Sequence, residues 1–188
     1  MKIPLWGAAG TSEGIDVNWV QLWENGPKFA ECNIGVTDGN PLSYGNHYSW
    51  GGFENKGQTY NTGDVKLEGD SDTATKVWGS NWRMPTMGEL EALFANCAWS
   101  YTTLKGDIHC WKFTGKGKYS HNSVVLPAAG YASDGGTYAQ NTDGYYWSSE
   151  PEQGTSGAYY LYLKSTEPLY LSNFRTNYYS VRPLLKED

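Results

Sequence analysis

The chain has 188 residues, which is enough to bury the core of one domain without a metal or a disulfide. Its 23 glycines, 9 tryptophans and 15 tyrosines, with only 18% charged residues, indicate many turns and an aromatic interior, and so favour a β-rich fold. The formal net charge of −6 argues against binding to nucleic acids or anionic membranes, and no apolar run is long enough to span a bilayer.

The N-terminal part of the chain predicts two short strands. Residues 1–14 resemble a flexible lead-in and residues 185–188 a ragged tail, so we expect one domain from 15 to 184. In "IDVNWVQLW" (15–23), Ile15, Val17 and Trp19 alternate with polar residues, and "ENGPKF" then turns the chain into "FAECNIGV". This pattern predicts a hairpin, and the aromatic, glycine-rich segment 44–53 predicts strand and loop.

Two helices are predicted in the middle of the chain. The clearer one covers about 86–97, where Thr86 and Glu89 have the spacing of a capping box. Its apolar residues recur on one helical face: Leu90, Leu93, Phe94 and Cys97. We expect this helix to be the longest and to bury the first three of these residues against a sheet. A shorter helix is predicted at 72–78, capped by Ser71 or Asp72 and ended by Gly79.

After residue 100 every segment has the pattern of a strand or a loop. The strand candidates are short, aromatic or β-branched, and separated by Gly, Asn, Asp and Ser clusters: "CWKFTG", "NSVVLPAAGY", "GYYWSSE", "AYYLYL" and "YSVRPL". Strands, then two helices, then a loop-rich and mostly antiparallel sheet indicate the α+β class.

Patterns typical of catalysis or metal binding are weak. Ser12 in "GTSEG" matches a nucleophile motif, but the β-branched "IDVNWV" follows where that motif needs a helix. His47, His109 and His121 have no pairing typical of a metal or nucleophile site. The loops "GDSD" (69–72) and "SDGG" (133–136) could hold Ca²⁺, yet turn and N-cap roles explain them equally well. We therefore expect no catalysis at Ser12 or at any histidine; no cofactor is indicated, and a metal site is left undefined.

The three cysteines do not define a redox compartment. Cys32, Cys97 and Cys110 are an odd set without a C-x-x-C pair, so the count predicts neither a zinc site nor a full disulfide framework. At most one disulfide can form, and buried free thiols are the alternative that we favour.

Several motifs occur together in a recognisable order: "ECNIG", "YGNHYSWG", "WGSNWRMPTMGELEAL", "VVLPAAGY", "YYWSSEP", "AYYLYL" and "SVRPL". In this order the chain resembles the major-paralogous-domain proteins of gut bacteria. Their C-type-lectin-like fold is also that of variable proteins of diversity-generating retroelements. The resemblance covers about 15–184 and implies this fold for the chain. The related formylglycine-generating enzymes use a reactive cysteine pair that has no counterpart here, and the Ca²⁺-dependent sugar motifs of animal lectins are missing, with "EPE" (150–152) only a partial match.

Some of these motif residues are expected to be scaffold. Trp82 and Arg83 lead into the longer helix, and Arg182 closes the last strand; an arginine at such a junction is expected to pair with a buried carboxylate or with backbone carbonyls. Trp147 is expected to fill the core under a binding face, with a partner for its indole N–H. The small residues of "LPAAG" suit a close approach of two backbones.

The segment 145–184 is unusually rich in Tyr, Ser, Asn and Thr. In the retroelement relatives, Asn codons of a template repeat are copied with adenine-directed errors, which populates Tyr, Ser, Asn, Asp, Thr, His, Phe and Leu. The resemblance therefore implies a variable ligand-binding face made of Tyr160, Tyr162, Tyr170, Ser172, Asn173, Phe174, Thr176, Asn177 and Tyr178. Antibody paratopes use a similar composition, although a constant sheet made of strand and turn formers would also look like this.

These observations predict a non-enzymatic domain that binds a protein or glycan on another cell or surface. We expect it on a bacterial surface or a phage tail, with any secretory signal trimmed from this chain, and without nucleic-acid binding or membrane insertion. A constant adhesive or structural module that binds glycan is the main alternative, and an enzyme of related fold is the third. The first hypothesis predicts that the following side chains are exposed on one side: Tyr160, Tyr162, Tyr170, Asn173, Phe174, Asn177 and Tyr178. It places Trp147, Leu161, Val181 and Arg182 inside.

Overall fold

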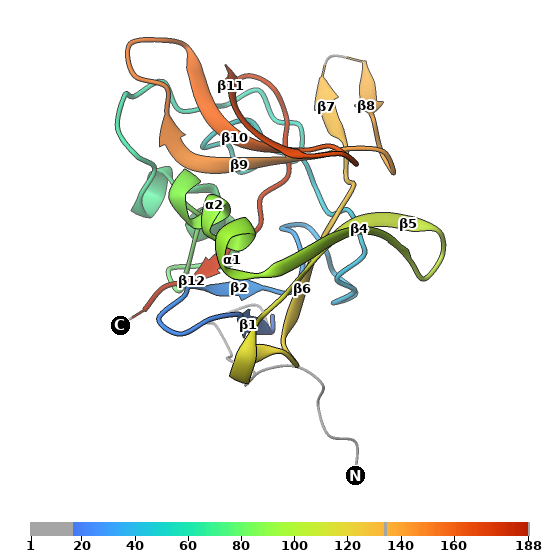
Figure 1. Ribbon diagram of the computed structural model, residues 1–188. Coiled ribbons are helices and arrows are strands. Elements are labelled where there is room, and N and C mark those ends of the chain that lie inside the picture. Colours follow the sequence, from blue (N-terminus) through green and yellow to red (C-terminus); the bar gives the residue numbers. More distant parts are fainter. Residues whose placement is uncertain (1–16, 134, 188) are drawn as a thin grey trace.

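The computed structural model describes residues 17–133 and 135–187 and shows a mixed chain with few helices and mostly antiparallel sheets (Figure 1). The helices are α1 (Thr73–Trp78) and α2 (Met87–Asn96), and single 3₁₀ turns lie at Gly69–Ser71 and Gly117–Tyr119. The strands are β1 (Trp19–Gln21), β2 (Lys28–Ala30), β3 (Trp82–Arg83), β4 (Ala98–Leu104), β5 (Ile108–Thr114), β6 (Ser123–Pro127), β7 (Tyr131–Ser133), β8 (Gly136–Tyr138), β9 (Gly144–Pro151), β10 (Gly157–Leu163), β11 (Pro168–Phe174) and β12 (Leu184–Leu185). The α+β class predicted from the sequence is confirmed. The lead-in 1–14, with Ser12, lies outside the described residues.

The strands form three sheets and one separate hairpin. The sheet orders are β1-β2-β12-β3, β11-β10-β9 and β4-β5-β6, and β7 pairs with β8. All ladders between these strands are antiparallel. Figure 1 shows α2 between the β9–β11 sheet above it and the β1-β2-β12 strands below it.

The predicted N-terminal hairpin is present. Strands β1 and β2 pair from Trp19 opposite Ala30, and the C-terminal strand β12 adds between β2 and β3. The "YSVRPL" segment is strand only at its end, because Tyr179 and Ser180 make single bridges to Tyr48 and Tyr146 instead. The last strand therefore joins the N-terminal hairpin to β3 within one sheet.

Both predicted helices form where their caps predict. In α2 the Thr86 side chain accepts from the Glu89 backbone N–H, and Glu89 accepts from the Thr86 backbone N–H. In α1 Asp72 is the N-cap, and Gly79 ends the helix with a φ of 98°. α2 is the longest helix of the described residues and buries Leu90 and Leu93 completely.

The expected full burial of Phe94 is wrong, since its side chain is only partly buried. Its ring stands edge-on to Phe113 and Trp99, with ring centres 4.9 and 5.4 Å apart. The phase of the helix is right, but Phe94 lies at the margin of the apolar stripe, where it reaches the ring of the exposed Tyr170 in β11, with ring centres 6.3 Å apart.

Strand β10 separates two apolar cores. Tyr160 packs with Trp147 and Tyr179 on one face, whereas Leu161 and Leu163 pack with the core under α2 on the other. This division follows from the alternation of side chains along a strand. The Trp147 indole N–H donates to the Tyr48 carbonyl over 2.8 Å, as expected for a buried tryptophan.

The two predicted scaffold arginines make the kinds of contact that were expected. Arg83 forms a two-pronged ion pair with Glu89, at 2.7 and 2.6 Å. Arg182 is fully buried and donates to the Ala30 and Glu31 carbonyls and to the Asn33 side-chain oxygen, at 2.7 to 3.0 Å. Burial lowers the pKa of the Arg182 guanidinium from its ordinary value, because the charged form loses water.

The remaining sequence features have simple structural roles. Gly130, in "LPAAGY", has a φ of 69°, and a Cβ there would lie 2.1 Å from the Tyr138 carbonyl oxygen, so two backbones do meet closely. The cysteines are buried free thiols, and burial raises the pKa of Cys97 and Cys110 to about 11. Among the helices of residues 17–133 and 135–187, none is long and apolar enough to cross a membrane.

Candidate functional site

The nine residues predicted to form a variable face do not lie on one side of the domain. Residues that lie directly opposite each other in the β10–β11 ladder point to the same face of the sheet. The register places Leu171 opposite Tyr160, and Asn173 opposite Ala158. Tyr160, Tyr162 and Asn173 therefore share one face of the sheet, and the alternate residues of β11, Tyr170 among them, share the other. Ser172 and Phe174 belong to this second group, and Thr176–Tyr178 follow β11 in a turn. The expectation of a single face is wrong because these strands alternate.

Two of these residues are also buried, contrary to the prediction. Tyr160 is 5% exposed because its ring packs against Tyr179 and Trp147, with ring centres 4.7 and 5.9 Å away. Tyr178 is 8% exposed, and its backbone exchanges two hydrogen bonds with Ala132 of β7.

The other predicted residues keep some contact with solvent. Tyr170, Phe174 and Thr176 are exposed. Tyr162, Ser172, Asn173 and Asn177 are half-buried. The predicted interior residues Trp147, Leu161, Val181 and Arg182 are fully buried, which confirms that part of the prediction.

Tyr162 belongs to a group of four tyrosines with neighbouring rings, named the tyrosine cluster: Tyr131, Tyr138, Tyr145 and Tyr162. The rings of Tyr145 and Tyr162 are stacked with centres 4.6 Å apart, and Tyr131 lies 4.9 Å from Tyr145 and 5.5 Å from Tyr138. Tyr138, at one end, is 44% exposed, and the other three are half-buried. The cluster thus forms a nearly continuous aromatic surface from β10 through β9 to the β7–β8 hairpin.

Two hydroxyls of the tyrosine cluster lie in surroundings that favour their neutral form. The Tyr162 hydroxyl donates to the Asp143 carboxylate over 3.0 Å. Burial, followed by contacts with neighbouring phenol and carboxylate groups, raises the pKa of Tyr145 above its ordinary value, and burial also raises the pKa of Tyr162. Tyr145 and Tyr162 therefore offer ring faces and neutral, hydrogen-bonding hydroxyls.

A cavity of about 360 Å³ is lined in part by β7, the strand that carries Tyr131 of the tyrosine cluster. Its lining combines aromatic, amide and hydroxyl side chains: Gln58, Tyr60, Ser133, Thr176, Asn177 and Tyr178. Ser133 projects to the same side of β7 as Tyr131, two residues earlier, so β7 joins the cavity to the cluster. Three of the cavity residues come from the turn that the sequence singled out.

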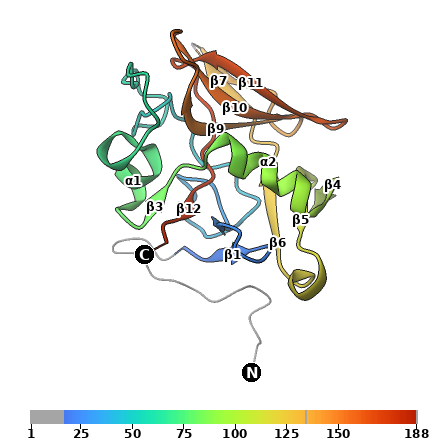
Figure 2. The ribbon, with the colours of Figure 1, turned by 60° about the vertical axis from the view of Figure 1, so that its left-hand side comes forward.

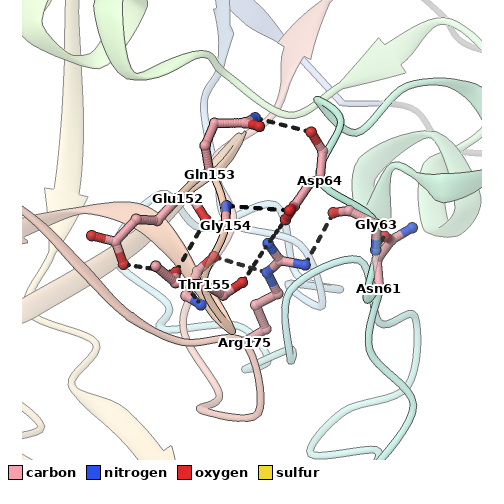
Figure 3. Close-up of polar contacts among 9 residues, drawn as sticks. Asn61, Gly63, Asp64, Glu152, Gln153, Gly154, Thr155 and Arg175 are labelled. Atoms are coloured by element: carbon pink, nitrogen blue, oxygen red, sulfur yellow. Dashed lines mark hydrogen bonds and ion pairs between the residues drawn. The ribbon is translucent and has the colours of Figure 1, made fainter.

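Arg175 holds this turn in place (Figure 3). Its side chain is buried and donates to the Gly63, Gly157 and Thr155 carbonyls and to the Asp64 carboxylate, at 2.8 to 3.3 Å. Asp64 also accepts from the Gly154 backbone N–H, and the Arg175 hydrogen bond is the main reason that the pKa of Asp64 lies below its ordinary value.

No local sequence pattern indicates this role for Arg175, because two of its partners are about 110 positions away. The guanidinium also lies 4.8 Å from the centre of the Trp50 ring, which adds a cation–π contact. One side chain thus joins the 61–64 loop, the 152–156 loop and the turn of the candidate site.

The Arg175→Met variant should lower the free energy of unfolding by about 1–3 kcal/mol, because buried carbonyls lose their donor while Asp64 can turn to water. Urea unfolding followed by tryptophan fluorescence would measure this change. Lys66→Met is a suitable control, since it removes an exposed ion pair with Glu68 and should change stability by less than about 1 kcal/mol. Equal effects of the two substitutions would contradict the role given to Arg175.

A larger cavity, of about 530 Å³, lies at the start of α2. Its charged lining is largely paired internally, because Arg83 binds Glu89 and Lys66 binds Glu68 at 2.6 and 2.7 Å. We therefore place the candidate site at the tyrosine cluster and not at the start of α2.

His47, His109 and Asp72 make structural contacts. His47 is buried with Nε2 3.0 Å from the Ala129 carbonyl oxygen, and His109 Nδ1 lies 2.7 Å from the Tyr101 hydroxyl. The Asp72 carboxylate of "GDSD" accepts from the Thr75 backbone N–H, as its predicted N-cap role requires, and also from the Met84 backbone N–H. Within the described part of the chain, no three His, Cys, Asp or Glu side chains are placed to hold a metal ion.

Comparison with known proteins gives a family match over part of the chain. Residues 102–184 match the model of a family described as a domain of unknown function (DUF8237). No curated protein and no solved structure matches the chain. The matched segment begins in β4 and ends in β12, so it contains the whole tyrosine cluster and Arg175. Gln58 and Tyr60, which also line the cavity, lie outside it.

Proposed function

We propose that this protein is a non-enzymatic ligand-binding domain that presents the tyrosine cluster and the adjoining cavity to a protein or glycan on another cell or surface. The observation that carries the proposal is the run of four neighbouring, partly exposed tyrosine rings, joined through β7 to a cavity lined with Tyr, Asn, Gln, Ser and Thr. The motif resemblance supports a C-type-lectin-like fold related to the major-paralogous-domain proteins of gut bacteria, and a location on a bacterial surface or a phage tail.

The geometry suits a binding surface because its rings are already ordered. Each tyrosine of the cluster is held by at least one ring neighbour, so little side-chain entropy remains to be lost when a ligand binds. Aromatic rings give a large contact area, and the hydroxyl and amide groups around the cavity can select a hydrogen-bonding partner. Aromatic faces of this kind stack on sugar rings as well as on peptide groups, so the same surface serves either ligand class.

The resemblance favours a binding surface whose sequence is diversified by a retroelement. Phe174 and Thr176 are exposed and Asn177 is only half-buried, so changes at these positions should cost the fold little. Tyr160 and Tyr178 are packed in the interior, and variation there would disturb the core.

A constant glycan-binding module is the second candidate, and two hydrogen bonds favour it. The Tyr162 hydroxyl is fixed to Asp143, and the Asn173 amide donates to the Tyr179 hydroxyl over 2.9 Å. Side chains tied to the scaffold in this way suit a surface of constant sequence. The gene distinguishes the two candidates: an imperfect repeat of codons 145–184 next to a reverse transcriptase gene would establish diversification.

Screening the purified domain against protein and glycan arrays tests the proposal. For a ligand so identified, Tyr138→Ala and Asn177→Ala should each weaken binding by about 2 kcal/mol, or roughly 30-fold, as aromatic and central contacts do. Isothermal titration calorimetry would measure the change, and stability should stay within about 0.5 kcal/mol.

Tyr159→Ala is the matched control, because Tyr159 is 38% exposed on the opposite face of β10. It should leave the affinity unchanged. Loss of binding with Tyr159→Ala, but not with the other two variants, would move the site to that opposite face.

A further inference from the structure

Strand β11 forms one edge of its sheet and carries no charged side chain. The sheet order is β11-β10-β9, and residues 168–174 read "PLYLSNF". Tyr170 and Leu171 are each 38% exposed and Phe174 is 63% exposed. Figure 2 shows this strand along the upper margin of the molecule. Natural proteins usually protect a long apolar edge with charges, prolines or a covering segment, because such an edge readily pairs with another strand.

The backbone groups on this free edge can be identified from the register. Just outside the two ends of β11, the Lys164 N–H donates to the Glu167 carbonyl and the Arg175 N–H donates to the Ser156 carbonyl. Hydrogen-bonded pairs recur at every second residue of an antiparallel ladder, so between 167 and 175 the odd-numbered residues of β11 bond to β10. Leu169, Leu171 and Asn173 therefore face β10, and the N–H and C=O groups of Tyr170 and Ser172 face outward. Within the described residues these outward groups have no hydrogen-bond partner.

We propose that this edge pairs with β11 of a second copy of the chain, antiparallel and about a two-fold axis at Leu171. Tyr170 then lies opposite Ser172 of the partner subunit, and each such pair exchanges two N–H···O=C hydrogen bonds. By symmetry the contact contains two of these pairs, so every outward group of Tyr170 and Ser172 is satisfied. The two three-stranded sheets become one continuous sheet across the axis.

The two ends of the strand match this register. Phe174 lies opposite Pro168 of the partner subunit, and proline has no N–H to donate. The Phe174 N–H is already bonded to its neighbour Asn173, at 2.8 Å, and the Phe174 carbonyl accepts from Asn177. The positions that lack free donors therefore face each other. A two-fold axis at Tyr170 instead would leave the Ser172 carbonyl without a donor.

A second copy suits this edge better than a charged partner. The protein has a formal net charge of −6, which opposes self-association over most surfaces. The uncharged residues of 168–174 bring no like charges together, and the exposed Leu171 side chains meet across the axis. Main-chain groups make the contact, so it would persist if the side chains of Tyr170 and Ser172 varied. One pair of seven-residue strands is a small interface, so the dimer should depend on concentration.

Sedimentation velocity of the full chain at increasing concentration tests the proposal. The wild-type protein should shift from monomer to dimer, whereas Leu171→Glu and Leu171→Lys, each measured alone, should weaken dimerisation at least about tenfold because like charges then meet at the axis. An equimolar mixture of the two variants should recover the dimer, a result that loss of folding cannot produce. Val65→Glu is the control for Leu171→Glu, since it adds the same charge at a 70% exposed position in the loop before the Gly69–Ser71 turn.

Three results would overturn the proposal. The first is a wild-type protein that stays monomeric up to about 1 mM, a concentration at which even a very weak dimer is populated. In that case the edge of β11 would be available to pair with a strand of a different protein. The second is a dimer that tolerates both Leu171 variants, since its contact would then lie elsewhere. The third is a mixture of the two variants that remains monomeric.

Discussion

The Arg182→Ala variant should lose about 3–5 kcal/mol of unfolding free energy, since it leaves the acceptors at Ala30, Glu31 and Asn33 without a donor and opens space in the interior. The Asn33 amide also lies 3.4 Å from the Tyr146 hydroxyl, which donates to the Pro127 carbonyl over 2.6 Å. Arg182 therefore supports a polar network between three segments. Removing a buried cation relieves some desolvation, but the unpaired acceptors and the empty volume outweigh that relief. Urea unfolding would measure the loss.

Arg83→Ala is the matched control for this prediction. Arg83 also stands beside a proline-containing motif, but its side chain is 33% exposed and its ion pair with Glu89 is partly screened by water. We expect a loss of about 1 kcal/mol, as for exposed ion pairs. A loss at Arg182 no larger than that at Arg83 would mean that the buried network contributes little to stability.

Leu93→Ala should lower the free energy of unfolding by about 2–5 kcal/mol, the usual range for a fully buried leucine. Leu93 has no exposed surface and belongs to the core between α2 and the β9–β11 sheet. Guanidinium unfolding at constant pH would measure the change. Glu91→Ala, at an exposed position two residues away on the same helix, should change stability by less than about 0.5 kcal/mol. Similar effects of the two substitutions would show that α2 is only loosely packed on the sheet.

The helices could be predicted from the sequence because their determinants are local. The capping box of Thr86 and Glu89 lies within one turn, and the apolar spacing of Leu90 and Leu93 fixes the buried face. The N-terminal hairpin was predictable for the same reason, since its turn and both strands lie within residues 19–30.

The burial of the tyrosines in β10 could not be predicted from the strand pattern. Alternation correctly separates Tyr160 from Leu161, but it does not show what covers each face. Tyr179 and Trp147 cover Tyr160, and both come from other parts of the chain. Alternating tyrosine and leucine give the same sequence pattern whether the tyrosine face of the strand is buried or exposed. The pattern alone therefore does not distinguish these two cases.

The candidate site was only partly predictable. Tyr162 and Asn177 were singled out from composition and resemblance, whereas Tyr131, Tyr138 and Tyr145 join them only through sheet register and the packing of the β7–β8 hairpin. Local patterns carry no information about such long-range pairings.

The position of β10 between two cores has a consequence for how the protein unfolds. Tyr160 and Leu161 are neighbours in the chain, yet each belongs to a different core. When β10 leaves the sheet, both cores lose the side chains that this strand contributes, so we expect the two cores to unfold together. The domain should therefore behave as a single cooperative unit, and damage to one core should weaken the other through a single strand.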